Sequence, residues 1–246
     1  MPLESSAYLS HLRADAARLA DVATGHLTER VPSCPDWDVA ALVLHTATVY
    51  QHKVACMRLG RRPDDGDWPQ QAPHGDVVRW LGESLGTLVD ELVSRGPDAP
   101  SYTWFPPDQT VGFWFRRMAQ ETAVHRVDAE LAVGSVTPID EALAIDGVDE
   151  LLNAFLGGDW SDEPVPSASG SSIGFRTGGH EWSVTMRPAE VVVHRDLDGA
   201  AATVSGEPTD LLLWLWGGRV GDDVVRVEGD TGALDELRKR LDLVTD

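Results

Sequence analysis

The segment QETAVHRVD, residues 120–128, places a carboxylate and an imidazole four residues apart. On a helix, Glu121 and His125 share one face and lie about one turn apart. The preceding stretch, residues 113–118, carries several bulky apolar side chains, so we expect a largely buried helix. Because a buried polar group is costly without a partner, this pair needs a physical explanation.

His45 offers a third polar group with a similar setting. It lies in a segment of helical periodicity beside Leu42 and Val49, and so also faces an interior. Facing helices of a four-helix bundle can bring one histidine and a Glu-x-x-x-His pair into one coordination sphere. Two imidazoles and one carboxylate suit zinc or another borderline divalent ion and leave a position open, as in catalytic sites. The alternative that these are ordinary helix-surface or hydrogen-bonded core residues stays open, because polar pairs at this spacing are common on helices.

The elements that would position these residues are four helices in the first 140 residues, indicated by apolar residues at helical spacing. Asp38 is the expected N-cap of the helix that carries His45. The connections are of moderate length, which is typical of an antiparallel bundle. The expected helices cover about residues 6–25, 39–60, 76–94 and 111–134.

After Pro138 the sequence changes character. A further helix is expected over about residues 141–156, followed by a Pro/Ser/Gly-rich loop and several alternating, β-branched stretches. The pair Gly178-Gly179 lies between two such stretches and predicts a hairpin. We therefore expect an α+β chain of two domains: a four-helix bundle in residues 1–140, and in residues 141–246 a smaller α+β domain with a mainly antiparallel sheet.

Composition limits the classes of partner. The net charge is −20, from 40 acidic and 20 basic residues, and no Lys/Arg-rich run offsets it. Such a chain repels a phosphate backbone, so nucleic acid is not expected as a partner. No apolar run reaches membrane-spanning length and no signal-peptide pattern is visible, which predicts a cytoplasmic protein. The two cysteines, Cys34 and Cys56, form no disulfide framework and are expected to be packing residues.

Two segments carry a family resemblance. VPSCPDWDVAALVLHTATVY (31–50) and FWFRRMAQETAVHRVDAELAVG (113–134) resemble the N-terminal domain of the mycothiol-dependent maleylpyruvate isomerase family, a branch of the DinB-like metal-binding bundles. HEWSVTMRP (180–188) and ATVSGEPTDLLLWLWGGR (202–219) resemble its C-terminal α+β domain. In CPDWDV, an aspartate stands where the family usually has a small residue.

The resemblance implies both the ligands and the cofactors. The family holds its metal through a histidine on the second helix and through a glutamate and a histidine on the fourth. These positions fall on His45, Glu121 and His125. The implied cofactors are a divalent metal, with zinc expected, and the small thiol mycothiol.

The implied activity is cis–trans isomerisation. A dication deprotonates a coordinated thiol, and the thiolate adds to an electrophilic double bond, which rotates as a single bond before elimination. Arg219 is the expected catalytic residue, because the family has an arginine near this place and a guanidinium matches a carboxylate of a dicarboxylate substrate. Arg219 could instead be a charge at a helix C-terminus.

Two other functions remain open on the sequence. The same thiolate would serve a mycothiol S-transferase that attaches the cofactor to an electrophile. A bundle that binds a metal or a ligand without turnover is the other alternative.

Five further features bear on the site. His52 lies two turns after His45 and could be a ligand, although a partly exposed position beside Lys53 fits better. Asp128 could orient a ligating imidazole, and Arg126 is expected to point away from the metal face. GSSIG (170–174) lacks the strand–helix setting of a nucleophile motif, and His180-Glu181 lacks the second histidine of a zinc motif.

Overall fold

The computed structural model describes residues 2–72, 75–165, 168–217 and 219–245. The chain divides into two compact units, Pro2–Thr137 and Pro138–Asp246, which we call the helical unit and the C-terminal unit. This division lies within three residues of the boundary expected from the sequence. Each unit is described by itself.

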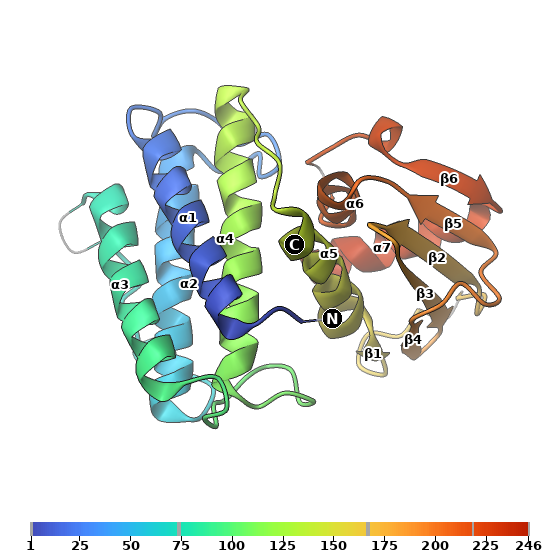
Figure 1. Ribbon diagram of the computed structural model, residues 1–246, viewed down its shortest axis with the longest axis horizontal. Helices are drawn as coiled ribbons and strands as arrows, with labels where there is room; N and C mark the ends of the chain where they lie inside the picture. The colour runs from blue at the N-terminus through green and yellow to red at the C-terminus, as the bar shows by residue number, and fades with distance from the viewer. Residues whose placement is uncertain (1, 73–74, 166–167, 218, 246) are drawn as a thin grey trace. The chain divides into compact units, whose positions relative to one another are not determined.

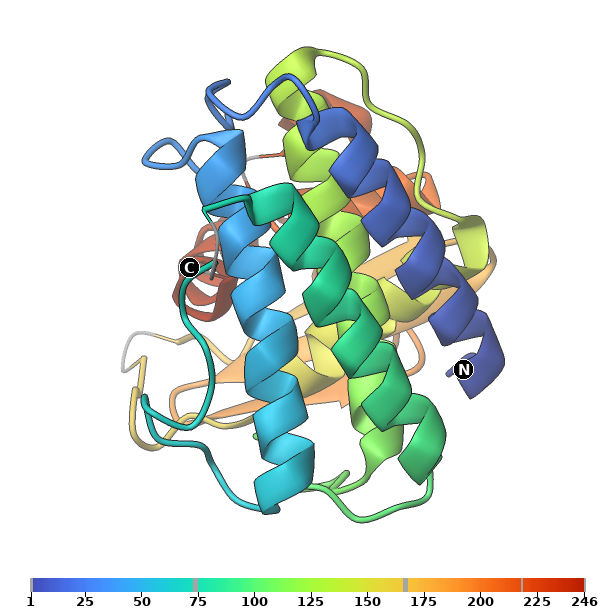
Figure 2. The same ribbon diagram turned by 90° about the vertical axis from the view of Figure 1, so that its left-hand side faces the viewer.

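Four long helices make up most of the helical unit (Figures 1 and 2). They are α1 (Ser5–Ala23), α2 (Val39–Leu59), α3 (Val77–Arg95) and α4 (Val111–Val133). The Asp38 carboxylate accepts a hydrogen bond from the Ala41 amide at 2.8 Å, which confirms the predicted N-cap of α2. Gly60 and Gly134 end α2 and α4 in the left-handed conformation that favours glycine. The four-helix prediction is therefore confirmed.

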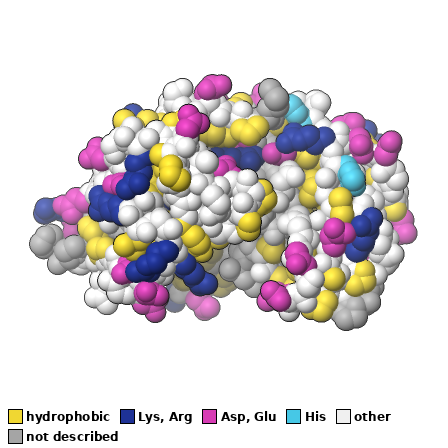
Figure 3. All heavy atoms as spheres, turned by 90° about the horizontal axis from the view of Figure 1, so that it is seen from below, with side chains coloured by type: hydrophobic (Ala, Val, Ile, Leu, Met, Phe, Trp, Pro, Cys, Tyr) yellow, Lys and Arg dark blue, Asp and Glu magenta, His cyan; other side chains and the backbone are white. Residues whose placement is uncertain are grey.

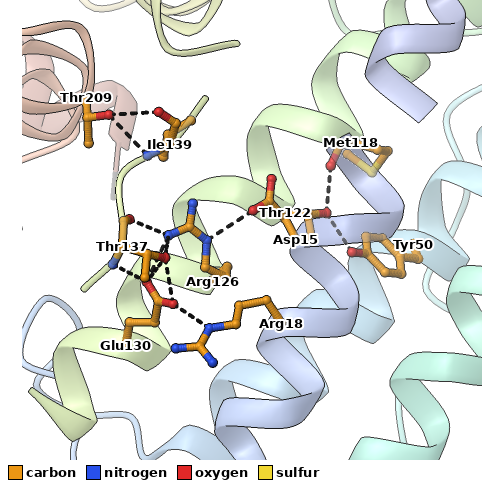
Figure 4. A network of polar contacts seen from close by, with 10 residues as sticks. All are labelled: Asp15, Arg18, Tyr50, Met118, Thr122, Arg126, Glu130, Thr137, Ile139 and Thr209. Carbon is orange, nitrogen blue, oxygen red and sulfur yellow. Dashed lines mark hydrogen bonds and ion pairs between the residues drawn. The ribbon is translucent and has the colours of Figure 1, made fainter. Parts of the chain in front are cut away.

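The fourth helix, α4, is buried along most of its length, including several charged side chains. Glu130 is fully buried and accepts hydrogen bonds from Arg126 at 2.8 Å and from Arg18 of α1 at 2.8 Å (Figure 4). Arg126 also donates to Asp15 of α1 and to the carbonyl of Thr137. These bonds join α1 to α4. They also direct Arg126 towards Asp15, Glu130 and Thr137, none of which is a candidate ligand, as expected for a side chain that points away from the metal face.

The C-terminal unit begins with α5 (Glu141–Glu150), which continues as a π-helix, η1 (Leu151–Leu156). The predicted helix over about residues 141–156 is therefore present over its whole span, and its last six residues are π-helical. The Gly157 amide bonds to the Leu152 carbonyl at 2.9 Å, five residues back. Apolar spacing predicts a buried helical segment, but it does not separate four-residue from five-residue hydrogen bonding over so short a stretch.

Six strands form one sheet in the order β1-β4-β3-β2-β5-β6. Among the strands of the described residues only β2 and β5 pair in parallel, so the mainly antiparallel sheet is confirmed. Two further helices, α6 (Pro208–Leu215) and α7 (Gly232–Thr245), and the short 3-10 helix η2 (Asp222–Val224) complete the unit. The strands are β1 (Gly158–Asp159), β2 (Ser172–Thr177), β3 (His180–Arg187), β4 (Glu190–His194), β5 (Ala202–Ser205) and β6 (Arg226–Gly229).

The predicted hairpin joins β2 and β3. Thr177 pairs with His180, so the turn consists of Gly178 and Gly179 alone. Both have positive φ, 52° and 76°, as the favoured two-residue hairpin turn requires.

Surface charge is mixed rather than segregated. On the face in Figure 3, Lys and Arg side chains lie in small groups with Asp and Glu side chains among them. Among the residues that the structure describes, no helix has the length and apolarity needed to cross a bilayer.

Candidate metal centre

The three predicted ligands meet in the helical unit. Glu121 Oε1 lies 3.2 Å from His125 Nε2 on α4 and 3.5 Å from His45 Nε2 on α2. One ligand atom from each residue lies within 4.8 Å of the other two. Ligand atoms of a tetrahedral site with bonds of about 2.1 Å lie roughly 3.4 Å apart. The separations of Glu121 from the two histidines are therefore close to those of ligands that share one ion.

The antiparallel course of α2 and α4 brings these residues together. His45 lies beside Glu121 and His125, and further along α2 the Tyr50 hydroxyl bonds to the Thr122 hydroxyl at 2.6 Å. Thr122 in turn donates to the Met118 carbonyl at 2.7 Å, so Tyr50 is the donor in the first bond (Figure 4). This buried link fixes the helix register next to the site.

An aromatic ring borders the site. Trp37, in the loop before α2, has its ring centroid 4.7 Å from that of His45 and 6.4 Å from that of His125. The His45 side chain keeps 37% of its exposure, whereas His125 keeps 12% and Glu121 18%. Solvent and small molecules therefore reach the centre mainly on the His45 side.

Asp128 positions His125 from behind. The His125 Nδ1–H donates to Asp128 Oδ2 at 2.9 Å, and Ser33 donates to the other carboxylate oxygen at 2.5 Å. Asp128 is fully buried. A carboxylate on the far nitrogen fixes the tautomer and leaves Nε2 for a metal, which is the usual arrangement behind a ligating histidine. The role weighed for Asp128 in the sequence analysis has this geometric support.

The carboxylate of Glu121 is held in its charged form. Burial alone would raise its pKa, but the charge of His125, hydrogen bonds from both histidines and the charge of Arg117 hold the pKa well below its usual range. Arg117, itself buried, donates to Glu121 Oε2 at 3.2 Å. Glu121 is thus deprotonated and ready to bind a cation.

His125 is the group that a metal would have to deprotonate. Burial alone would lower its pKa, but the Glu121 charge and the hydrogen bonds to Asp128 and Glu121 raise the pKa to about 9. In the metal-free protein its proton therefore occupies the position that a cation would take. A dication would replace that positive charge between the same ligands, so the donor set fits a divalent metal.

Two other predicted residues are not part of the ligand group. His52 is outside the ligand group: its ring packs edge-on against Trp68, with centroids 4.6 Å apart, and its Nδ1 accepts from Lys53. Arg219, in the C-terminal unit, donates to the carbonyls of Trp216 and Gly217 at 2.8 and 3.2 Å. Such bonds are typical of a positively charged side chain that caps the C-terminal end of a helix. A catalytic role for Arg219 stays a prediction.

Sequence reasoning missed three contributors to the site: Ser33, Trp37 and Arg117. Arg117 could have been found, because it precedes Glu121 by four residues on the same helix. Ser33 and Trp37 lie within the SCPDW stretch, whose contact with α4 is a matter of tertiary structure. Cys56 is buried, and burial raises the pKa of its thiol to about 11, in agreement with a packing role.

The fold and the site together define a four-helix bundle with a candidate His-Glu-His metal centre, followed by an α+β unit. Two family models match the chain: the mycothiol maleylpyruvate isomerase N-terminal domain over residues 9–130, and the C-terminal domain of the same family over residues 142–236. The chain belongs to the mycothiol maleylpyruvate isomerase family.

Two solved structures share the fold. The crystal structure of the mycothiol-dependent maleylpyruvate isomerase has a TM-score of 0.57, and that of a mutant with one histidine replaced by alanine has 0.56. In each case the identity is 14%, with 93% of this chain and 95% of the other covered. No curated protein matches the sequence.

Proposed function

We propose that this chain is a cytoplasmic, metal-dependent enzyme that uses mycothiol as its thiol cofactor. The proposed reaction is cis–trans isomerisation of an electrophilic double bond, as in maleylpyruvate, by thiolate addition and elimination. The observation that supports it most is the convergence of His45, Glu121 and His125 in a chain of this family. A free thiol cofactor also fits a reducing compartment.

Each residue has a definite task in this proposal. His45, Glu121 and His125 hold the cation, with zinc as the proposed metal because two imidazoles and a carboxylate suit it. When bound, the dication keeps a coordinated thiol deprotonated at neutral pH. Asp128 keeps the proton of His125 on Nδ1, and Trp37 covers one side of the imidazoles.

Arg219 is the proposed catalytic residue of the C-terminal unit, where its guanidinium would bind a substrate carboxylate. A planar guanidinium can meet a carboxylate with two parallel hydrogen bonds. In that role it would exchange at least one of its bonds to Trp216 and Gly217 for bonds to the substrate.

A thiol-dependence assay tests the function. Protein purified without a His-tag and loaded with zinc is mixed with maleylpyruvate, with and without mycothiol, and the cis and trans forms are followed by proton NMR. We expect turnover only with mycothiol, and no net consumption of the thiol. Equal turnover without mycothiol would refute the cofactor, whereas accumulation of a thioether would identify an S-transferase.

Matched histidine variants separate an enzyme from a passive metal binder. His45→Ala should lose zinc and turnover together, while His180→Ala, at an exposed strand end of the C-terminal unit, should keep both. A wild-type protein that binds zinc but turns over no electrophile would support the non-catalytic alternative.

A further inference from the structure

Lys53 is a partly buried cation of the helical unit that the metal centre does not use. It is one of only two lysines in the sequence, with Lys239. The residue as a whole is half-buried, but its ammonium lies deep enough for burial to lower its pKa. A cation in such a position normally has a charged partner, because removing it from water is costly.

The neighbours of the Lys53 ammonium are uncharged. It donates to His52 Nδ1 at 3.0 Å and lies 5.3 Å from the centroid of the Trp114 ring. Burial lowers the pKa of His52 to about 4, so that imidazole is neutral and can accept the bond. No carboxylate of the described residues lies within 4.0 Å of the ammonium. By contrast, the buried cations Arg117 and Arg126 each contact a glutamate.

Lys53 lies at the same contact between α2 and α4 as the metal centre. It follows His45 by eight residues, about 12 Å along a helix, and packs over Trp114, which precedes Glu121 on α4. Two charged residues of α4 that contact each other also act on the pKa of Lys53: the charge of Glu121 raises it and that of Arg117 lowers it. The positive charge of Arg117 therefore reaches the same region.

We propose that Lys53 binds a carboxylate of the substrate, about two helical turns from the metal centre. This inference rests on the proposed function in one respect, namely that the anion belongs to the molecule that the thiol attacks. The separation indicates a substrate whose carboxylate lies several bonds from its electrophilic carbon. The Trp114 face and the partial burial strengthen the attraction, because water screens it less.

A comparison of a charged with an uncharged electrophile shows whether Lys53 binds a substrate carboxylate or affects turnover of any substrate. Zinc-loaded wild type, Lys53→Met and Lys53→Arg are assayed with mycothiol on maleylpyruvate and on dimethyl maleate, which has a cis double bond but no charge. We expect Lys53→Met to raise KM for maleylpyruvate by about 10-fold to 100-fold, as for a lost hydrogen bond to a charged group. KM for dimethyl maleate should change by less than about twofold, since the lost bond is absent there.

Lys53→Arg should recover most of the loss, and the matched control Lys239→Met, in the exposed part of α7, should resemble wild type. Equal losses on the two electrophiles would overturn the proposal, as would no loss on either. The same variants are compared by thermal melting. Removing a partly buried unpaired charge should leave the melting temperature unchanged or raise it, whereas a structural lysine would lower it.

A binding measurement keeps this inference separate from the proposed reaction. If wild type turns over neither electrophile, the proposed function fails, but titration calorimetry of zinc-loaded protein with maleate still tests Lys53. We expect wild type and Lys239→Met to bind maleate alike, and Lys53→Met to bind it at least about 10-fold more weakly. Absence of binding to wild type, or equal binding to Lys53→Met, would show that Lys53 does not form a carboxylate site.

Discussion

At the scale of single residues, the centre combines a charged carboxylate with an imidazole whose orientation is fixed. Asp128 and Ser33 hold the far side of His125, so the near nitrogen faces Glu121. Glu121 also forms an ion pair with Arg117, which limits the excess of negative charge at the site. The centre therefore depends on residues that would not touch the metal.

The first prediction concerns Asp128. Asp128→Asn keeps the shape but removes the charge that orients His125 and raises its basicity, so zinc affinity should fall by about 10-fold to 100-fold. Competition with a fluorescent chelator measures this. Asp36→Asn, at an exposed position in the loop before α2, is the matched control and should bind zinc as wild type does. Unchanged affinity in Asp128→Asn would contradict its positioning role.

The second prediction concerns pH. The pKa of His125 is raised to about 9 in the metal-free protein, and a ligating imidazole must be neutral. Zinc must therefore displace a proton below pH 9, so apparent zinc affinity should rise about tenfold per pH unit up to that value. Calorimetry in buffers of different ionisation enthalpy should show about one proton released per zinc at pH 7.5. Affinity independent of pH between 7 and 8.5 would be inconsistent with a protonated His125.

The same shifts set the stability of the metal-free protein. His125 has a folded pKa above its unfolded value of 6.5, so its contribution is complete below 6.5 and is lost as pH rises through about 9. Glu121 has a folded pKa below its unfolded value of 4.5, so its contribution is present above 4.5 and is lost as pH falls through the folded value. The pair therefore stabilises the metal-free protein most between these limits.

At the scale of elements, α2 supplies one ligand and α4 the other two, and their register decides whether the three atoms meet. Tyr50 follows His45 by five residues and Thr122 directly follows Glu121, and the bond between their hydroxyls is fully buried. The start of α2 is also constrained, because Asp38 caps it directly after Trp37, which packs on His45.

The third prediction compares two N-caps. Asp38 caps α2 and Asp76 caps α3 through equivalent bonds to Ala41 and Arg79 amides, at 2.8 and 3.0 Å. Replacing either by alanine should lower the free energy of unfolding by about 1 kcal/mol. Only Asp38→Ala should also weaken zinc binding, since only α2 carries a ligand. Equal zinc affinity in the two variants would show that the start of α2 does not position His45.

Most elements could be predicted from the sequence because their signals are local. Helical apolar spacing, the Asp38 cap, and the glycines at 60 and 134 fixed the bundle helices closely. Glu121 and His125 could be paired by spacing alone. His45 was a candidate from its apolar helical setting, and the family resemblance implied that it belongs to the same ligand set. Trp37 and Lys53 acquire their surroundings only when α2 and α4 pack together. Such contacts join residues far apart in sequence and leave no periodic signal.

At the scale of the whole molecule, the proposed function assigns metal binding to the helical unit and the catalytic arginine to the C-terminal unit. All three candidate ligands lie in Pro2–Thr137, as do Asp128 and Lys53. Arg219 lies in Pro138–Asp246. Metal binding and catalysis should therefore be separable.

The fourth prediction tests this separation with a fragment. Residues 2–137, which keep the Thr137 contacts to Arg126 and Glu130, should bind one zinc with an affinity within about tenfold of the full chain. Turnover should be lost, because the fragment lacks Arg219. Equilibrium dialysis with metal analysis measures the binding, and circular dichroism checks that the fragment is helical. A helical fragment that binds no zinc would place part of the metal site outside the helical unit.

The most direct test of the central claim uses cobalt as a spectroscopic substitute for zinc. Co²⁺ is titrated into tag-free, metal-free protein, and mycothiol is then added. We predict one equivalent bound, with the intense visible bands of a tetrahedral ion, and a new sulfur-to-cobalt charge-transfer band when the thiol is added. Both signals should disappear in His45→Ala, Glu121→Ala and His125→Ala. Tight cobalt binding in these variants would contradict a thiol-activating centre at these residues. A spectrum of bound cobalt that does not change when mycothiol is added would contradict it as well.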